Sequence, residues 1–486
     1  MDHHRVREHA GPRPDPAAGR GEVTQPANGV PLGERAVVLG GSIAGLFAGH
    51  VLAEAYREIV VVDRDRLLGV TGTRHATPQA FHAHALLARG QRAIEELFPG
   101  ITAQSRAAGV PTGDVGADLR WVINGRRLPK VRSGLVCLAI PRTALEQTVR
   151  ERVRALPNVT FREGHDVREL VTTPDRRRVT GVRILHRRDG RSELLPADLV
   201  VDATGRGSRL PVWLAELGYQ PPAEERIKIR LSYTTRHYRL PLGLLGTDLA
   251  YIVAQTPSHP RGAVFARERA LPDGGERYVL SLNAHLGDQA PTEPEGFLGY
   301  ARTVPVPEIH DALRVAEPLD EIRAYQFPTS LWRHYERLSR FPDGLLVLGD
   351  AMASPNPVYA QGNTITAVEA LVLRDHLRRG AEPRPVEFFA AVAPTIRAAW
   401  EINVLGDLAY PGVVGARSPR VRLAGAYLAR VHRAVTEDPV VAESFLRVAG
   451  LIDGPQALLR PGMLARVLGR RHPAPRPAAA AATVPS

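Results

Sequence analysis

The hexapeptide GGSIAG at 40–45 lies between an apolar run and a helix-forming stretch, a context typical of a turn that holds a pyrophosphate. Gly40 permits a tight turn, and Gly45 allows a helix to pack closely on a strand. The helix N-terminus would offer unpaired N–H groups to the phosphates. Asp63 ends the next apolar run, where a carboxylate can accept hydrogen bonds from ribose hydroxyls. Ser42 replaces the middle glycine of this fingerprint, so a plain strand–helix turn is the alternative interpretation.

Two further segments combine an apolar run with a glycine-rich turn. DATGRGSR at 202–209 is by itself a generic strand-to-turn pattern. GDAMASPNPVYAQGN at 349–363 places Asp350 at the end of a strand and Gly362-Asn363 at the start of a helix. A carboxylate there can hold a ribityl hydroxyl, and the helix N-terminus can stabilise negative charge on a reduced flavin ring. The three segments together predict one flavin site.

The elements that must position these residues follow from hydrophobic periodicity. The runs AVVLG, IVVVD, LVVDA and LLVLG predict buried parallel strands. Helices are predicted at 43–55, 85–97, 141–156, 363–379, 386–407, 420–436 and 438–450. Between 227 and 328 polar and apolar residues alternate, which predicts antiparallel strands with one covered face. The expected fold class is therefore α/β.

Composition narrows the class of protein. The chain has 486 residues and a net charge of +12, but nearly all the positive charge is scattered arginine, with only two lysines, Lys130 and Lys228. No basic stripe with a reader motif is present, so nucleic acid is not an expected partner. Cys137 is the single cysteine, which excludes an intramolecular disulfide. With no signal peptide and no apolar run long enough to span a membrane, the expected location is cytoplasmic.

Four segments of the sequence resemble the motifs of a known protein family. VVLGGSIAGL, PQAFHAHALLARGQRAIEELFPG, LVVDATGRGSR and GDAMASPNPVYAQGN, in this order, resemble the single-component flavoprotein monooxygenases of the para-hydroxybenzoate hydroxylase type. The chain is similar to their squalene-epoxidase-like branch, which includes polyether epoxidases of actinomycetes, and GDLAYPGV at 406–413 resembles the same branch. The resemblance implies FAD held by Gly40, Ser42, Ile43, Ala44, Gly45, Asp63, Arg64, Arg142, Asp350, Pro357, Gly362 and Asn363.

The fold that this resemblance implies is a Rossmann-like FAD-binding domain of the GR2 type, with an inserted antiparallel β-sheet substrate domain and C-terminal helices. The expected segments are a disordered tail at 1–33, the first part of the FAD-binding domain at 34–226 with 110–135 near the substrate side, the substrate-binding β domain at 227–330, the second part of the FAD-binding domain at 331–395, a C-terminal helical region at 396–471 and a second disordered tail at 472–486.

The implied reaction uses NADH or NADPH and dioxygen to epoxidise or hydroxylate a small hydrophobic substrate, a polyene or an aromatic compound of secondary metabolism such as antibiotic biosynthesis. A flavin C4a-hydroperoxide would carry the oxygen, so no catalytic side chain is identified. A flavin halogenase, a prenyl-chain reductase and a non-catalytic protein that holds FAD or a metabolite are the alternatives. Halogenases carry a W-x-W-x-I-P signature and a lysine near the flavin, and the sequence has neither.

His82 and His84, in QAFHAH, would face the same way on a strand. A zinc site needs further ligands, and none is evident, so no metal is expected. A structural role or a contact near the flavin is the favoured interpretation. The oligomeric state stays open at this stage.

Overall fold

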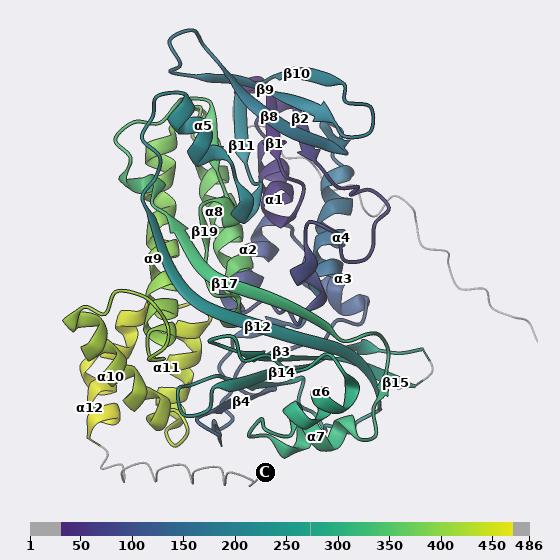
Figure 1. Ribbon diagram of the computed structural model, residues 1–486, viewed down its shortest axis with the longest axis vertical. Coiled ribbons are helices and arrows are strands. Elements are labelled where there is room, and N and C mark those ends of the chain that lie inside the picture. The colour runs from purple at the N-terminus through teal and green to yellow at the C-terminus, as the bar shows by residue number, and fades with distance from the viewer. Residues whose placement is uncertain (1–30, 273, 470–486) are drawn as a thin grey trace, which may run out of the picture.

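The computed structural model describes residues 31–272 and 274–469. Its first sheet is parallel and five-stranded, in the order β18-β11-β1-β2-β7 (Figure 1). The strands are β1 Gly33–Leu39, β2 Tyr56–Asp63, β7 Val159–Glu163, β11 Leu199–Asp202 and β18 Leu345–Val347. Residues 36–39 are fully buried, because α1 (Ile43–Leu52) packs on the sheet and because β8 (His165–Thr172) and β9 (Val179–His186), from a separate antiparallel sheet, contact β2 and β11. The α/β class and the buried parallel strands predicted from the sequence are confirmed.

Helices from distant parts of the chain pack on this sheet. They are α1 Ile43–Leu52, α2 Ala88–Leu97, α3 Ile101–Ala107, α4 Arg142–Arg154, α5 Leu210–Glu216 and α8 Gly362–Leu377. α1 contacts both α4 and α8, and its Leu46 and Phe47 are fully buried. The predicted helix at 85–97 begins three residues later, since the Leu86 N–H donates to the Leu138 carbonyl in an isolated bridge and is not available to a helix.

The second sheet has nine strands, and its long strands β12 and β17 run beside each other through the middle of the molecule (Figure 1). Its strands are β4 Leu119–Ile123, β5 Arg126–Arg127, β12 Glu224–Pro241, β13 Ala250–Val253, β14 Arg261–Ala270, β15 Gly275–Ala284, β16 Glu317–Pro318, β17 Arg323–Arg333 and β19 Ala353–Ser354. β12 pairs antiparallel with β15 and with β17, which confirms the antiparallel strands predicted there.

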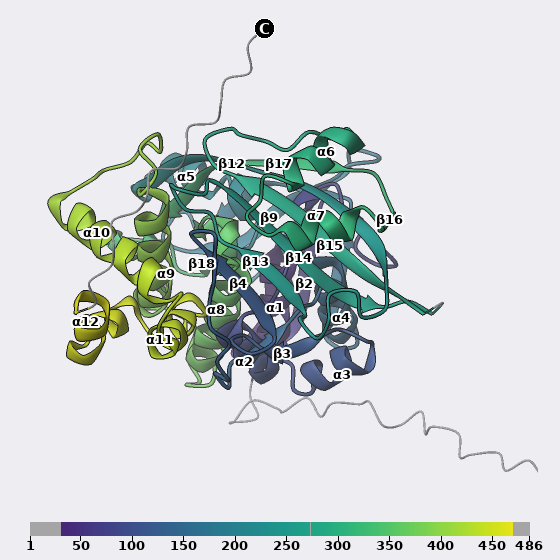
Figure 2. The same cartoon turned by 90° about the horizontal axis from the view of Figure 1, so that it is seen from below.

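The prediction that this sheet has one covered face is wrong. Val279 and Leu280 are neighbours on β15, face opposite ways and are both buried. On one side α6 (Pro294–Ala301) and α7 (Pro307–Leu313) supply apolar side chains, and Figure 2 shows these two helices beside β14 and β15. On the other side the segment 83–88 packs against the sheet. A sheet held between two layers has no solvated face, whatever the polarity of its sequence.

Several elements were not anticipated. They include β3 Thr112–Asp114 and β6 Val136–Leu138, which pair with each other, and a three-stranded antiparallel sheet of β8 His165–Thr172, β9 Val179–His186 and β10 Ser192–Pro196. Short 3-10 helices occupy η1 Pro78–Phe81, η2 Gly205–Gly207, η3 Tyr335–Arg337, η4 Gly349–Ala351, η5 Pro357–Tyr359 and η6 Pro455–Leu459. Three of these, η2, η4 and η5, lie in the glycine-rich turns singled out from the sequence.

The last described part of the chain forms a helical layer beside the second sheet (Figures 1 and 2). Its members are α9 Pro385–Asp407, α10 Pro419–Ala434, α11 Pro439–Ala449 and α12 Pro461–Leu468. The first three match their predicted ranges, and α12 was not predicted. Within 31–272 and 274–469, no helix has both the length and the apolar character needed to cross a bilayer. The two expected tails lie outside the described residues, except for 31–33, of which Gly33 begins β1.

Candidate functional site

The three segments predicted to form one site follow three strands of the parallel sheet. The turn at 40–45 follows β1, the turn at 202–209 follows β11, and the segment 349–363 follows β18. These strands are neighbours and parallel, so all three turns leave the same edge of the sheet. The topology therefore brings together segments that are more than a hundred residues apart in sequence.

The first turn depends on two glycines. Gly40 has a φ of +97°, and a Cβ on it would lie 2.6 Å from the Ala203 carbonyl oxygen in the second turn. A Cβ on Gly45 would overlap the carbonyl oxygen of Gly40. The turn and the first turn of α1 are therefore too close to each other, and to β11, for any larger residue at these positions.

The remaining predicted residues of the first turn lie at the start of α1. Ser42 is the N-cap residue, but its hydroxyl donates to Glu146 Oε2 at 3.0 Å and does not cap the helix. Ile43 is buried and Ala44 half-buried, and a Cβ on Gly349 would lie 2.7 Å from the Ala44 Cβ. The first and third segments therefore touch at this point.

Asp63 braces the glycine turn. Its Oδ2 accepts from the Gly41 N–H at 2.6 Å, and its Oδ1 accepts from the Asp65 N–H at 2.7 Å. Burial raises the pKa of Asp63, and these two backbone bonds oppose that shift. Arg64 is exposed beside it. The ribose contact expected of Asp63 stays a prediction.

Arg142 connects the first and third segments. Its Nη2 donates to Ser42 Oγ at 3.1 Å, and its Nη1 donates to Asn363 Oδ1 at 2.6 Å (partners 100 and 221 residues away). Its Nε lies 3.5 Å from Glu146 Oε2 and is buried without a hydrogen bond. Burial lowers the pKa of the Arg142 guanidinium, while Glu146 and Asp350 raise it. A half-buried cation between the first and third segments suits an anionic or oxygen-rich ligand.

Asp350 lies in η4, where the third segment meets the second. Its Oδ2 accepts from Ser354 Oγ at 3.2 Å, and Ser354 Oγ in turn accepts from Arg206 Nη1 at 2.9 Å. Burial raises the pKa of the Asp350 carboxyl, and the positive charges of Arg206 and Arg142 oppose that shift. Two arginines from different elements therefore act electrostatically on the same carboxyl group.

The segment before α8 forms an open end of that helix. Pro357 is exposed at the start of η5, and Gln361, the N-cap residue of α8, makes no side-chain cap. A Cβ on Gly362 would meet nothing within 4 Å, so there is open space in front of the helix. The N-termini of α1 and α8 both lack a side-chain cap, and such ends stabilise negative charge.

Sequence reasoning missed three charged residues of the site: Arg74, Glu146 and Glu369. Arg74 Nη2 donates to Glu146 Oε1 at 2.7 Å, and both side chains are buried. Arg142 and Glu146 are four residues apart on α4, a spacing that could have indicated the pair. Glu369, fully buried on α8, accepts from the Gly349 N–H at 2.6 Å, and burial raises its pKa to about 8. Nothing in its local sequence distinguishes it.

The motif at 406–413 contributes a buried polar cluster behind the third segment. Asp407, which is fully buried, accepts from Asn356 Nδ2 at 2.8 Å and from the Tyr359 hydroxyl at 3.2 Å. A Cβ on Gly406 would overlap the Tyr359 side chain. The end of α9 therefore holds the loop that leads to α8.

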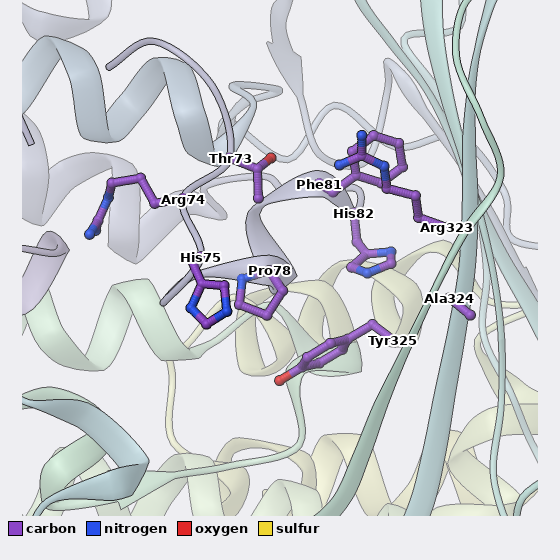
Figure 3. A pocket seen from close by; sticks show the side chains of 9 residues that line it. All are labelled: Thr73, Arg74, His75, Pro78, Phe81, His82, Arg323, Ala324 and Tyr325. Atoms are coloured by element: carbon purple, nitrogen blue, oxygen red, sulfur yellow. The ribbon is translucent and has the colours of Figure 1, made fainter. Parts of the chain in front are cut away.

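A cavity of about 440 Å³ lies between the loop after β2 and strand β17. Figure 3 shows the side chains of the loop on one side and those of β17 on the other. It is lined by Thr73, Arg74, His75, Pro78, Phe81, His82, Arg323, Ala324 and Tyr325. Arg74 belongs to the charged cluster with Glu146, so the cavity adjoins the three segments.

His82 and His84 do not lie on a strand, contrary to the geometry assumed from the sequence. They follow η1 as irregular backbone, because the Ala83 N–H between them bonds to the Ser281 hydroxyl and not to a strand. His82 Nδ1 lies 2.7 Å from Thr235 Oγ1, and His84 Nδ1 lies 2.8 Å from the His82 carbonyl. In the described part of the chain, no three His, Cys, Asp or Glu residues are grouped as metal ligands.

These features fit FAD. The glycine turn leaves no room for a side chain beside the α1 N-terminus, Arg142 has an unsatisfied buried N–H, and Gly362 leaves open space before α8. Bound FAD would be in reach of two uncapped helix N-termini and a half-buried guanidinium.

Comparison with known proteins agrees with this geometry. Residues 36–259 match the model of a family described as FAD dependent oxidoreductase. Protein Rv3254 of Mycobacterium tuberculosis is 35% identical over 444 residues, which cover 86% of this chain and 90% of that protein.

Solved structures with low identity share the fold. A probable FAD-dependent monooxygenase from Pseudomonas aeruginosa, PqsL, has a TM-score of 0.58 at 17% identity, over 85% of this chain and 99% of that one. The flavin-dependent brominase Bmp2 has a TM-score of 0.60 at 13% identity, over 86% and 93%. A flavoprotein/dehydrogenase from Cytophaga hutchinsonii has a TM-score of 0.60 at 14% identity, over 89% and 96%.

Proposed function

The chain belongs to the FAD dependent oxidoreductase family, and from this premise we propose that it is a flavin-dependent monooxygenase. It would use NADH or NADPH and dioxygen to place one oxygen atom in a small hydrophobic substrate, by epoxidation of a polyene or hydroxylation of an aromatic ring. The epoxidase-like motifs of the sequence favour epoxidation within this class.

The observation that carries the proposal is the position of Arg142 between Ser42 and Asn363. It places a half-buried cation where the pyrophosphate turn and the α8 N-terminus meet. In the proposal, Gly40, Ser42, Ile43, Ala44 and Gly45 form the pyrophosphate turn, Asp63 and Arg64 lie at the ribose, Arg142 and Asp350 bind the rest of the cofactor, and Pro357, Gly362 and Asn363 lie beside the flavin ring.

FAD, when bound, would supply the electron transfer and the activation of dioxygen. The protein's own residues would bind and orient the cofactor and the substrate, and they would exclude water from the site. The cavity is lined by the rings of Phe81 and Tyr325 as well as by polar and charged side chains, which suits an apolar substrate that also carries polar groups. Burial raises the pKa of the Asp350 carboxyl group. The positive charges of Arg206 and Arg142 oppose this shift and stabilise the carboxylate. No side chain needs to abstract a proton for the oxygen transfer itself.

A halogenase is the second candidate, because the brominase Bmp2 shares the fold. The lysines of this chain argue against it. Lys130 Nζ is 2.5 Å from Asp248 Oδ1, and Lys228 is exposed on β12. In the described residues neither lysine has a recorded contact with the three segments.

The test is turnover in labelled dioxygen. The FAD-loaded protein is incubated with NADH or NADPH and matched linear polyene and aromatic substrates, and the products are analysed by mass spectrometry. We expect one labelled oxygen atom per product molecule and one reductant consumed per turnover. Label that comes from water, or turnover that persists without dioxygen, would contradict a monooxygenase. A labelled hydroxyl group on an aromatic ring would still support a monooxygenase but would exclude epoxidation.

A further inference from the structure

His82 and Arg74 are the two buried polar side chains that line the cavity beside β17 (Figure 3). The ring of His82 lies between two tyrosines, with centroids 5.6 Å from Tyr233 and 5.5 Å from Tyr325. Its Nδ1 is 2.7 Å from Thr235 Oγ1, and its Nε2 has no hydrogen-bond partner among the described residues. One ring nitrogen is therefore held by the second sheet, and the other is free for a ligand.

A short chain of hydroxyl groups determines which nitrogen carries the proton. The Ala83 N–H donates to Ser281 Oγ at 2.8 Å, and Ser281 Oγ lies 2.6 Å from Thr235 Oγ1. If Ser281 donates to Thr235 and Thr235 donates to His82 Nδ1, every hydroxyl proton has an acceptor. In the reverse direction the buried Ser281 proton would have no recorded acceptor in the described structure, which costs about 1–3 kcal/mol. The chain therefore favours the tautomer with the proton on Nε2.

The surroundings keep the ring neutral. Burial, with the nearby His84 and His237, lowers the pKa of His82 to about 3. The acidic groups near these rings are already engaged, because Asp320 Oδ2 lies 2.6 Å from His237 Nδ1 and Glu268 lies on the other side of that ring. Arg323 lies over the Phe81 ring, 4.4 Å from its centroid. Within 31–272 and 274–469, no carboxylate lies within ion-pair distance of His82.

We propose that His82 presents its Nε2–H to the cavity as a hydrogen-bond donor, and so favours a ligand that carries an oxygen acceptor over a bare hydrocarbon. The inference deepens the proposed function and rests on it for the identity of the site. A carbonyl, ether or hydroxyl oxygen held at Nε2 would place the apolar part of the ligand in the cavity, beside the Tyr325 side chain that lines it. The class of ligand that His82 would recognise is therefore an apolar molecule that carries an oxygen acceptor.

The first test determines which ring nitrogen of His82 carries the proton. Protein labelled with ¹⁵N-histidine is studied by NMR, and the signal of His82 is assigned by its loss in His82→Phe. We expect the proton on Nε2 in the wild type. Thr235→Val removes the donor to Nδ1, so the ¹⁵N signal of Nδ1 should shift to the position of an acceptor nitrogen without a hydrogen bond. Thr234→Val is the matched control, since Thr234 donates to the Ala290 carbonyl and its replacement should leave this signal unchanged. A wild-type proton on Nδ1 would overturn the proposal.

The second test measures selection with FAD-loaded protein and two probes of one skeleton, 1-indanone and indane, followed by the flavin absorption. The ketone should bind about 3- to 10-fold more tightly than the hydrocarbon, as expected for one neutral hydrogen bond. His82→Phe should abolish that difference. A wild type without preference for the ketone, or a preference that His82→Phe retains, would overturn the proposal. FAD content is measured in every sample, so a failure to bind FAD points to the proposed function and not to His82.

Discussion

Arg142 has three guanidinium nitrogens directed at three elements: Ser42 at the N-terminus of α1, Glu146 on its own helix and Asn363 on α8. Replacing it removes a charged donor from the proposed FAD site. Since a hydrogen bond that involves a charged group contributes about 1.5–3 kcal/mol, Arg142→Ala should weaken FAD binding about 10- to 100-fold. Titration of the apoprotein with FAD, followed by fluorescence, measures this.

The matched control for Arg142 is Arg152→Ala on the same helix. Arg152 donates to Gln104 and to the Pro99 carbonyl, and it has no recorded bond with the three segments. Its replacement should leave FAD affinity within about 2-fold, because exposed charges contribute about 0–1 kcal/mol. Equal effects of the two variants would show that Arg142 is not at the FAD site.

Glu369 makes the stability depend on pH. Burial raises its pKa from 4.5 to about 8 in the folded state. Between these values the folded state binds more proton than the unfolded state, so the free energy of unfolding falls as pH rises from about 4.5 to 8 and is level above that. Glu369→Gln keeps an acceptor for the Gly349 N–H but does not titrate.

The gain in stability of Glu369→Gln over wild type should therefore grow from pH 5 to pH 8, by on the order of a few kcal/mol. Urea unfolding of the two proteins at four pH values tests it. A difference between the proteins that stays constant across this range would show that the Glu369 pKa is not raised.

At the scale of elements, the packing of α1 on β1 depends on Gly45. A Cβ there would overlap the Gly40 carbonyl oxygen, so α1 must move away from the turn. Gly45→Ala should lower the free energy of unfolding by roughly 1–3 kcal/mol and weaken FAD binding. Gly425→Ala on α10 is the matched control, because a Cβ at Gly425 meets open space.

The control should raise stability by roughly 0.5–1 kcal/mol, since alanine is a better helix former than glycine. Denaturant unfolding and FAD titration of both variants are the measurements. If Gly45→Ala were as stable as Gly425→Ala and bound FAD equally well, the turn at 40–45 would not be a close-packed pyrophosphate turn.

The arrangement of the strands and helices explains which side chains come into contact. Parallel pairing puts the turns after β1, β11 and β18 at one edge, and α8 returns to α1 from the far end of the chain. The second sheet is held between α6 and α7 on one side and residues 83–88 on the other, which positions His82 at its inner face. The cavity therefore lies between strand β17 of the second sheet and the loop that follows strand β2 of the first sheet.

For the whole molecule, the site links parts of the chain that are otherwise far apart, so FAD should stabilise the protein as a unit. At an FAD concentration of 100 times Kd, linkage raises the free energy of unfolding by about 2.7 kcal/mol. Thermal unfolding should show a Tm that rises with FAD concentration. FMN, which lacks the pyrophosphate-linked adenosine, should raise Tm less at the same concentration. Equal shifts for the two flavins would contradict a pyrophosphate turn at 40–45.

Much of the fold could be predicted from local sequence patterns. The strand, turn and helix at 36–55 follow from an apolar run, two glycines and helix-forming residues that are neighbours in sequence. The helices α8 to α11 were predicted for the same reason, since hydrophobic periodicity is read within one window of residues. Backbone requirements at Gly40 and Gly45 are likewise local, because they concern residues five positions apart.

Other features were decided only by the tertiary structure. The bonds of Arg142 to Ser42 and Asn363 join residues 100 and 221 positions apart, and the raised pKa of Glu369 comes from burial by distant segments. Both faces of the second sheet are covered because helices and a loop from elsewhere pack on it, which its alternating sequence did not indicate. Burial and hydrogen-bond partners depend on which segments lie side by side, and that is a property of the packed chain and not of any one window of it.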